Sequence, residues 1–191
     1  MLKSVIISGP PAIGKTTIAK GLAEEFNLTY LSGGDILKNM AKEEGFASDG
    51  NDWWDTEDGM KFLNQRKTNS DFDKKVDKKL QDFFHDGNVV ITSYTLPWLV
   101  NDGIKFWLSG TYENSAKRMK KRDNVSELEA LEVVKKRFNE NKIIYKSLYD
   151  FEFGDDLSVF DKIINTDDLN AEQVLEIAKL SVRELFDIKT A

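Results

Sequence analysis

An eight-residue segment near the N-terminus limits what this chain can fold into more than any other feature. It follows an apolar run at residues 2–8 and precedes a helical pattern with Ile18, Leu22 and Phe26 at four-residue spacing. The segment consists of Gly9, Pro10, Pro11, Ala12, Ile13, Gly14, Lys15 and Thr16. This G-x-x-x-x-G-K-[ST] spacing between a strand and a helix is typical of a phosphate-binding loop. We therefore predict that the segment binds a nucleoside triphosphate such as ATP.

The residue types in this loop each have a physical reason. Gly9 and Gly14 let backbone N–H groups turn toward phosphate oxygens, and the N-terminus of the next helix adds a positive dipole end. Lys15 is expected to reach the β- and γ-phosphates, Thr16 to bind Mg²⁺ through its hydroxyl, and Thr17 to contact the α-phosphate. The alternative is a glycine-rich turn with an incidental lysine, which would not require this spacing.

The length of the chain limits the number of domains, and its charge limits the kinds of partner that it can bind. The 191 residues, 40% of them apolar, suit one globular domain. The chain has 27 Lys and Arg against 33 Asp and Glu, a net charge of −6, so we expect neither nucleic acid nor membrane as a partner. The sequence has no cysteine and a single histidine, which excludes disulfides and thiolate or His-rich zinc sites.

The sequence has no pattern of a signal peptide or a membrane span. Its first apolar run is short and leads directly into the glycine loop instead of a cleavage site. No stretch approaches the roughly 18 apolar residues that a spanning helix needs. We expect a cytoplasmic protein, and we expect it to be a monomer.

Apolar runs and helical patterns alternate along the chain. Five runs are expected to be strands, namely residues 2–8, 28–31, 89–92, 104–108 and 162–165. The run at 28–31 is the weakest, and the other four have the composition of buried strands. This alternation predicts an α/β fold whose parallel sheet is covered by helices on both faces.

Two longer stretches interrupt this alternation. Residues 33–86 are polar and helical in pattern, and residues 112–149 are charged, helical and basic at their start. Both leave the core at the carboxyl ends of strands, where ligands bind in open α/β sheets. We expect a single domain over residues 1–191 in which both insertions close over a ligand. Residues 71–79 alternate in charge and are interpreted as a solvated helix.

Further motifs accompany the loop. They are Ser8-Gly9-Pro10-Pro11, Gly34-Asp35-Ile36, Asn88-Val89-Val90, Asp155-Asp156-Leu157-Ser158-Val159-Phe160 and Ile163-Ile164-Asn165-Thr166. Together they resemble the nucleoside monophosphate kinases, most closely the archaeal-type cytidylate kinases. The resemblance implies a P-loop NTPase fold of three α/β/α layers with a five-stranded parallel sheet, an acceptor-binding insertion at 33–86 and a helical lid at about 112–149. It also implies phosphoryl transfer from ATP with Mg²⁺ to a nucleoside monophosphate, with CMP or dCMP as the leading acceptor.

Three positions depart from this family pattern. The family has an acidic residue, a glycine and an arginine after the third strand, where this chain has Thr92-Ser93-Tyr94. Lys38 and Ile144 also stand where the family has arginines. A lysine can bind phosphate but cannot form the bidentate fork of an arginine. Two alternatives therefore stay open: a kinase of another small acceptor, and a non-catalytic nucleotide-binding regulatory protein.

Cationic side chains are the expected catalytic groups, because phosphoryl transfer depends on positioning and on stabilising charge on the moving group. Lys15 is one candidate. Arg118 and Arg122 lie four residues apart, hence on one face of a helix, and Arg137 can join them from the next helix. The alternative for these arginines is a solvated helix face that pairs with nearby acids.

The acceptor has its own candidate residues. Asp35 is a candidate to orient the acceptor, to hold a metal-bound water, or to act as a base toward a hydroxyl acceptor. Its alternative role is the N-cap of a helix. Further candidates for acceptor binding are Gly34, Lys38 and Arg66. By resemblance, Asn165 and Thr166 are expected beside the base of the donor nucleotide.

Overall fold

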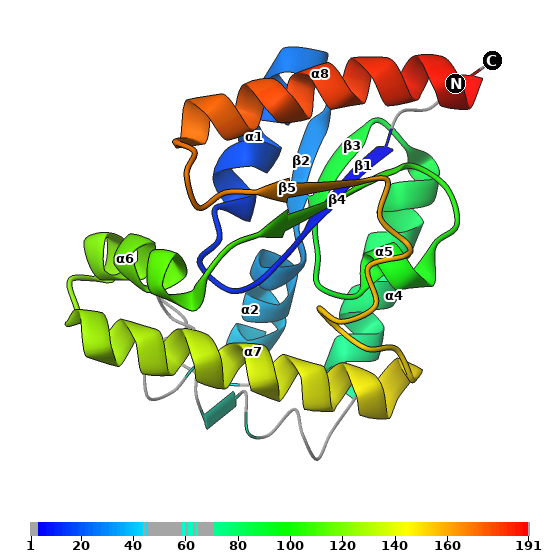
Figure 1. The fold of residues 1–191 in the computed structure, drawn as a ribbon. Coiled ribbons are helices and arrows are strands. Elements are labelled where there is room, and N and C mark those ends of the chain that lie inside the picture. The colour runs from blue at the N-terminus through cyan, green and yellow to red at the C-terminus, as the bar shows by residue number, and fades with distance from the viewer. Residues whose placement is uncertain are drawn as a thin grey trace.

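The computed structural model describes residues 4–43, 45, 59, 61, 62, 64 and 71–190, with side chains as far as Phe186. These residues form a sheet with helices on both faces (Figure 1). Its strands are β1 (Ser4–Ser8), β2 (Thr29–Ser32), β3 (Val89–Thr92), β4 (Ile104–Ser109) and β5 (Lys162–Asn165). Neighbouring strands are all parallel, in the order β2-β3-β1-β4-β5. The predicted α/β fold with a five-stranded parallel sheet is confirmed.

The central strand β1 places the glycine loop. It pairs with β3, where Val5 is opposite Val90, and with β4, where Ile7 is opposite Phe106. All five residues of β1 are buried, as expected for an apolar strand covered on both faces. The loop therefore starts in the middle of the carboxyl edge of the sheet, where ligands bind in such folds.

Two helices cover one face of the sheet. They are α1 (Lys15–Phe26) and α8 (Ala171–Thr190). Ile18 and Leu22 of α1 and Val174 and Ala178 of α8 join Ile7 of β1 in one buried cluster. The apolar residues that recur at four-residue spacing in α1 thus form the face that packs on the sheet.

The opposite face is covered by α2 (Gly33–Glu43), α4 (Asp71–Asp86) and α5 (Leu96–Leu99). The prediction that residues 71–79 form a helix is confirmed, but the prediction that this helix is solvated is wrong for one of its two faces. Within α4, apolar residues recur every four positions and pack against β1 and β3; they are Phe72, Val76, Leu80 and Phe84. Burying each such side chain contributes about 1.5–3 kcal/mol, which decides the orientation of the helix despite its alternating charges.

Two helices follow β4 and lie beyond the carboxyl ends of the central strands (Figure 1). They are α6 (Tyr112–Asp123) and α7 (Glu127–Tyr149). The C-terminal part of α7 packs into an aromatic cluster formed by Trp98, Trp107, Phe138, Tyr145, Phe151 and Phe153. Within it, Trp98 and Phe151 stack with ring centroids 4.3 Å apart and an interplanar angle of 4°. The cluster holds this end of α7 against the body of the protein.

The predicted strands agree with the observed ones to within a residue where the structure describes them. β2 begins one residue later than predicted and β4 ends one residue later, while residues 2 and 3 lie outside the described part. The prediction that residues 162–165 are a buried strand is wrong. Only Ile164 is buried there and Ile163 is 49% exposed, because β5 is the edge strand of the sheet.

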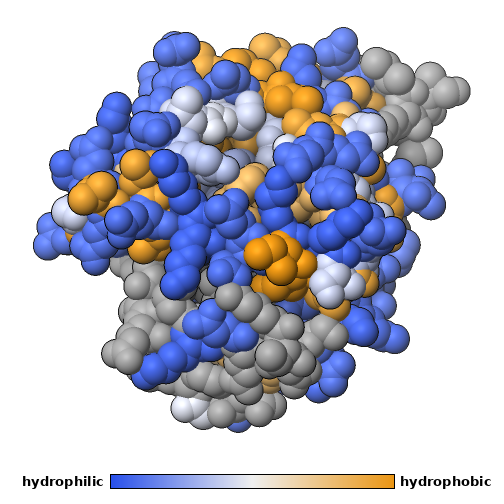
Figure 2. All heavy atoms as spheres, turned by 60° about the horizontal axis from the view of Figure 1, so that its bottom comes forward, coloured by the Kyte–Doolittle hydropathy of each residue, from blue (hydrophilic) through white to orange (hydrophobic). Residues whose placement is uncertain are grey.

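The surface of the described part is largely polar. Figure 2 shows one face on which hydrophilic side chains predominate and apolar side chains form separate groups outside the grey region. Among the described helices, none is both long enough and apolar enough to cross a membrane.

Candidate active site

The glycine loop has the backbone geometry of a phosphate cradle. Gly9 has a φ of 145°, and a Cβ there would lie 2.4 Å from the Leu108 carbonyl oxygen, so only glycine fits between β1 and β4. Gly14 has a φ of 103° and is the N-cap of α1 without a side-chain cap. A Cβ at Gly14 would meet no heavy atom within 4 Å. The first N–H groups of α1 therefore open toward space that an anion can fill.

Lys15 folds back into its own loop. Its Nζ donates to the carbonyl oxygens of Gly9 at 2.9 Å and Pro10 at 2.6 Å. Burial and the guanidinium groups of Arg137 and Arg122 hold the pKa of the Lys15 amine well below its usual range. Phosphate oxygens can replace the two carbonyls and restore the preference for the charged amine.

The site suits a metal ion that arrives with a nucleotide. Thr16 and Thr17 are exposed at the start of α1, which leaves both hydroxyls accessible. In the part of the chain that the structure describes, no group of three or more His, Cys, Asp or Glu side chains is placed to hold a metal ion. Mg²⁺ would therefore take its ligands from Thr16, phosphate oxygens and water, the set it prefers in such sites.

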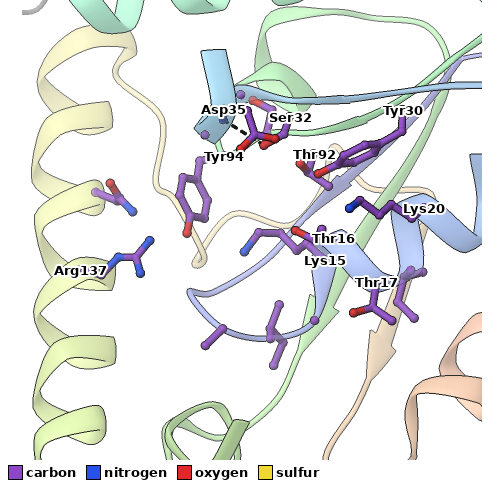
Figure 3. A pocket seen from close by; sticks show the side chains of 18 of the residues that line it. Lys15, Thr16, Thr17, Lys20, Tyr30, Ser32, Asp35, Thr92, Tyr94 and Arg137 are labelled. Carbon is purple, nitrogen blue, oxygen red and sulfur yellow. Dashed lines mark hydrogen bonds between the residues drawn. The ribbon is translucent and has the colours of Figure 1, made fainter. Parts of the chain in front are cut away.

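One continuous cavity of about 750 Å³ runs from the loop to α4. Its walls come from residues 12–18 of the loop and α1, from α2 and α4, from residues 92–95 after β3, from α6 and α7, and from residues 166–174. Figure 3 shows Arg137 reaching in from α7 opposite Lys15, with Tyr94 between Lys15 and Asp35. The volume lies in the range typical of small-molecule sites.

The three candidate arginines all line this cavity. Arg118 donates from Nη2 to the Thr166 carbonyl oxygen at 2.8 Å, and Arg122 forms an ion pair with Asp123. Arg137 lies one helical turn before Asn141 and two before Tyr145, and these three residues of α7 face the cavity together. The arrangement brings the arginines to the same space as Lys15.

The loop after β5 supplies polar atoms at the end of the cavity where we expect the base of the donor nucleotide. Thr166 lines the cavity, whereas Asn165 does not and accepts instead from the Asp167 N–H at 2.9 Å. Among the described atoms, the buried Thr166 Oγ1 and Arg118 Nη1 have no hydrogen-bond partner. Buried polar groups are normally paired, so a ligand atom at this position would stabilise both.

The end of the cavity at which we expect the acceptor, called the acceptor end below, is formed largely by α2 and α4. Gly34 and Asp35 line it, whereas Lys38 is absent from the described lining. The alternative prediction that Asp35 is an N-cap is wrong, because α2 begins at Gly33 and the Asp35 N–H donates to Ser32 Oγ at 3.2 Å. Ser32 is thus the capping residue. Arg66 lies outside the described residues.

Comparison with known sequences agrees with this geometry. A sequence model of the Cytidylate kinase-like family matches residues 4–168. The chain belongs to this family. The cytidylate kinase of Methanocaldococcus jannaschii is 32% identical over 186 residues, which are 95% of this chain and 98% of the relative. The cytidylate kinase of Sulfurisphaera tokodaii is 31% identical over 176 residues, 91% of each chain.

Solved structures agree on the fold. An uncharacterized protein from Eubacterium ventriosum has a TM-score of 0.63 at 17% identity and covers 96% of this chain, with 99% of its own chain matched. The shikimate kinase from Bacteroides thetaiotaomicron has a TM-score of 0.57 at 16% identity, covering 98% of this chain and 99% of its own. These likenesses show a P-loop kinase fold, and membership of the cytidylate kinase-like family implies the use of ATP.

Several residues of this kinase's cavity were missed in the sequence. Asp73 and Asp77 are buried and line the acceptor end, although their helix was interpreted as solvated. Asn141 is 3% exposed and lines the cavity from α7. A signal for Asn141 existed, because it follows Arg137 by four residues in a predicted helix. The four-residue period of apolar side chains in α4 was the corresponding signal for the two aspartates.

Proposed function

We propose that this kinase transfers the terminal phosphoryl group of ATP to a nucleoside monophosphate, with CMP or dCMP as the leading acceptor. The observation that carries the proposal is the single cavity that joins the phosphate loop to α2 and α4. Lys15 and Arg137 line this cavity and face each other across it (Figure 3). The curated relatives named above are cytidylate kinases and match more than nine-tenths of the chain, which supports the choice of acceptor.

The donor is held by the loop. Backbone N–H groups from Ala12 to Thr16 and the Lys15 ammonium bind the β- and γ-phosphates, and Thr17 is assigned to the α-phosphate. Thr16 would hold Mg²⁺ through its hydroxyl, and the ion would supply positive charge that offsets the charge of the phosphate oxygens. Arg118, Thr166 and Asn165 belong to the end that receives the donor base. Arg122 and Arg137 are assigned to the γ-phosphate, where they stabilise charge on the moving group.

The acceptor phosphate attacks in line from the other end. One of its oxygens forms a bond to the γ-phosphorus while the bond from that phosphorus to the bridging oxygen of ADP breaks, which gives ADP and the nucleoside diphosphate. This oxygen is already ionised, so no general base is required. Gly34 and Asp35 are assigned to hold the acceptor, with Lys38 and Arg66 as further candidates from the same region.

A hydroxyl acceptor is the second candidate, and one observation favours it. Among the described residues, the acceptor end carries the carboxylates of Asp35, Asp73 and Asp77 and no Lys or Arg side chain. Carboxylates bind hydroxyl groups and repel phosphate. In this case Asp35 would accept the hydroxyl proton as that oxygen attacks the γ-phosphorus.

The deciding experiment is phosphoryl transfer from Mg-ATP to CMP, dCMP, UMP, AMP and GMP, scored as diphosphate product. Lys15→Ala is the control, and its fold is checked by circular dichroism. We expect product from CMP or dCMP with the wild type and almost none with Lys15→Ala. Equal rates for both proteins would refute the proposed role of the loop. ATP binding without transfer to any monophosphate would favour a hydroxyl acceptor, which a panel of small hydroxyl compounds then tests, or a regulatory protein.

A further inference from the structure

Tyr94 stands at the boundary between the two ends of the cavity (Figure 3). Its ring is half-buried and lies under the Lys15 ammonium, with Nζ 4.6 Å from the ring centroid. This distance is within the roughly 6 Å over which a cation is attracted to an aromatic face. The aromatic ring therefore contacts the side chain on which the proposed grip on phosphate depends.

The backbone on both sides of Tyr94 is anchored. The Ser93 N–H donates to the Ile7 carbonyl oxygen at 3.2 Å, which extends the pairing of β3 with β1. Ser93 Oγ accepts from the N–H groups of Thr95 at 3.2 Å and Leu96 at 3.1 Å. Thr95 Oγ1 in turn donates to the buried Asp77. These bonds fix the position from which the Tyr94 side chain enters the cavity.

The ring itself is also held. It packs edge-on against Phe153 with centroids 5.4 Å apart at 83°, and it lies 6.2 Å from the ring of Tyr145 on α7. Phe153 is 1% exposed and Tyr145 is 3% exposed. A side chain fixed through both backbone and ring can hold a flexible lysine without first being ordered itself.

Several other groups act on the Lys15 ammonium. Arg122 from α6 and Arg137 from α7 repel it, and burial disfavours its charge. Asp35 of α2 lies on the far side of Tyr94 (Figure 3). The Lys15 ammonium is attracted by the carbonyl oxygens of Gly9 and Pro10 and by the negative face of the Tyr94 ring.

We propose that Tyr94 is a positioning residue whose ring holds the Lys15 side chain in the loop until phosphate oxygens replace the two carbonyls. The proposal rests on the function proposed above in one respect, that Lys15 contacts the nucleotide phosphates.

The test compares Tyr94→Phe, which keeps the ring, with Tyr94→Leu and Tyr94→Met, which remove it. We expect Tyr94→Phe to stay within about twofold of the wild type in kcat. The two ring-less variants should lose about tenfold in kcat, equivalent to about 1.4 kcal/mol, with a smaller change in the acceptor KM. Their KM for Mg-ATP should rise more than their KM for the acceptor, because the side chain that contacts the phosphates is no longer held in the loop.

A second readout does not depend on transfer. Without nucleotide, the rate at which an amine-acylating reagent modifies Lys15 is followed by mass spectrometry. We expect this rate to rise in Tyr94→Leu and Tyr94→Met, because the amine is no longer covered by the ring. Phe26→Leu is the control, since it removes a ring 5.7 Å from Arg183 Cζ on a part of α1 outside the cavity lining. It should change neither readout.

Three outcomes would overturn the proposal. One is a wild-type rate of Lys15 labelling in both ring-less variants, and another is an unchanged KM for Mg-ATP in variants that remain folded. The third is a loss in Tyr94→Phe equal to that in Tyr94→Leu, which would assign the effect to the hydroxyl. If the wild type transfers to no acceptor, the proposed function fails, yet Lys15 labelling still decides the role of Tyr94.

Discussion

The hydroxyl of Tyr149 donates to Asp77 Oδ2 at 2.7 Å and joins the last residue of α7 to the middle of α4. Asp77 Oδ1 accepts from Thr95 Oγ1 at the same time. Asp77 is 4% exposed, so its charge depends on such donors. The bond thus connects the helix that carries Arg137 with the helix that forms the acceptor end of the cavity.

Removing this hydroxyl should destabilise the protein. We expect Tyr149→Phe to lower the free energy of unfolding by about 1–3 kcal/mol, because a buried carboxylate loses one of its donors. Urea denaturation followed by circular dichroism measures this change. The control is Tyr112→Phe, for whose hydroxyl the described part shows no hydrogen bond, and it should cost less than about 0.5 kcal/mol. Equal costs for the two variants would contradict the role of the bond.

The raised pKa of Tyr149 leads us to expect that the stability of the protein falls at alkaline pH. Burial, the hydrogen bond to Asp77 and the negative charges of Asp77 and Asp73 raise the pKa of Tyr149 well above its usual value. The folded state therefore keeps the phenol proton at a pH where the unfolded chain releases it, and stability falls as pH rises above about 10. The wild type should lose stability over this range more steeply than Tyr149→Phe. Parallel slopes in urea titrations at several pH values would refute this.

Two glycines of the loop should respond differently to alanine. Both have positive φ, which costs an alanine about 1–3 kcal/mol. Only at Gly9 does the added methyl group also meet a backbone carbonyl, that of Leu108. We expect Gly9→Ala to unfold at lower temperature than Gly14→Ala, measured by differential scanning calorimetry. The reverse order would show that β1 and β4 can separate to accept a side chain.

Substitutions of Ser32 and Asp35 should also have different effects, the first on stability and the second on the rate of transfer. Loss of the Ser32 cap should lower stability by about 1 kcal/mol in Ser32→Ala. Asp35→Asn should change stability by less than about 1 kcal/mol, because only its interaction with the helix dipole is affected. If Asp35 orients the acceptor, this variant should lose roughly tenfold or more in transfer rate. Full activity in Asp35→Asn would show that Asp35 does not orient the acceptor and only interacts with the N-terminus of α2.

The affinity for Mg-ATP should depend on the charge of Lys15. It should fall as pH rises through the lowered pKa of this amine, because the neutral amine no longer attracts the phosphates. Arg137→Gln removes a positive charge that lowers this pKa, so the fall should occur at higher pH. Lys136→Gln, on the exposed side of α7, is the control. Calorimetric titration across alkaline pH measures both, and an unmoved midpoint in Arg137→Gln would contradict the coupling.

The fold and the phosphate loop could be predicted because their signals are local. Strands such as Val89–Thr92 are short apolar runs between turns, and the spacing of Gly9, Gly14 and Lys15 has few other uses. The burial of β5 could not be predicted, since an edge strand and a central strand have similar composition. What exposes Ile163 is the order of strands in the sheet, which is a long-range property.

The acceptor end was less predictable for a different reason. Asp73 and Asp77 look like surface residues because lysines flank them, and only the packing of Phe72, Val76 and Leu80 turns them inward. Ser32 was assigned to no role, because one residue at a strand end does not reveal where the next helix begins. In each case the deciding information was the position of one element relative to another.

The aromatic cluster anchors α7 as far back as Phe138, the residue next to Arg137. At about 1.5 Å per residue, the first turn of the helix lies about 16 Å from Phe138. A rotation of α7 about Phe138 would therefore displace the first turn and leave Arg137 nearly in place. The position of Arg137 is thus independent of small movements at the start of its own helix.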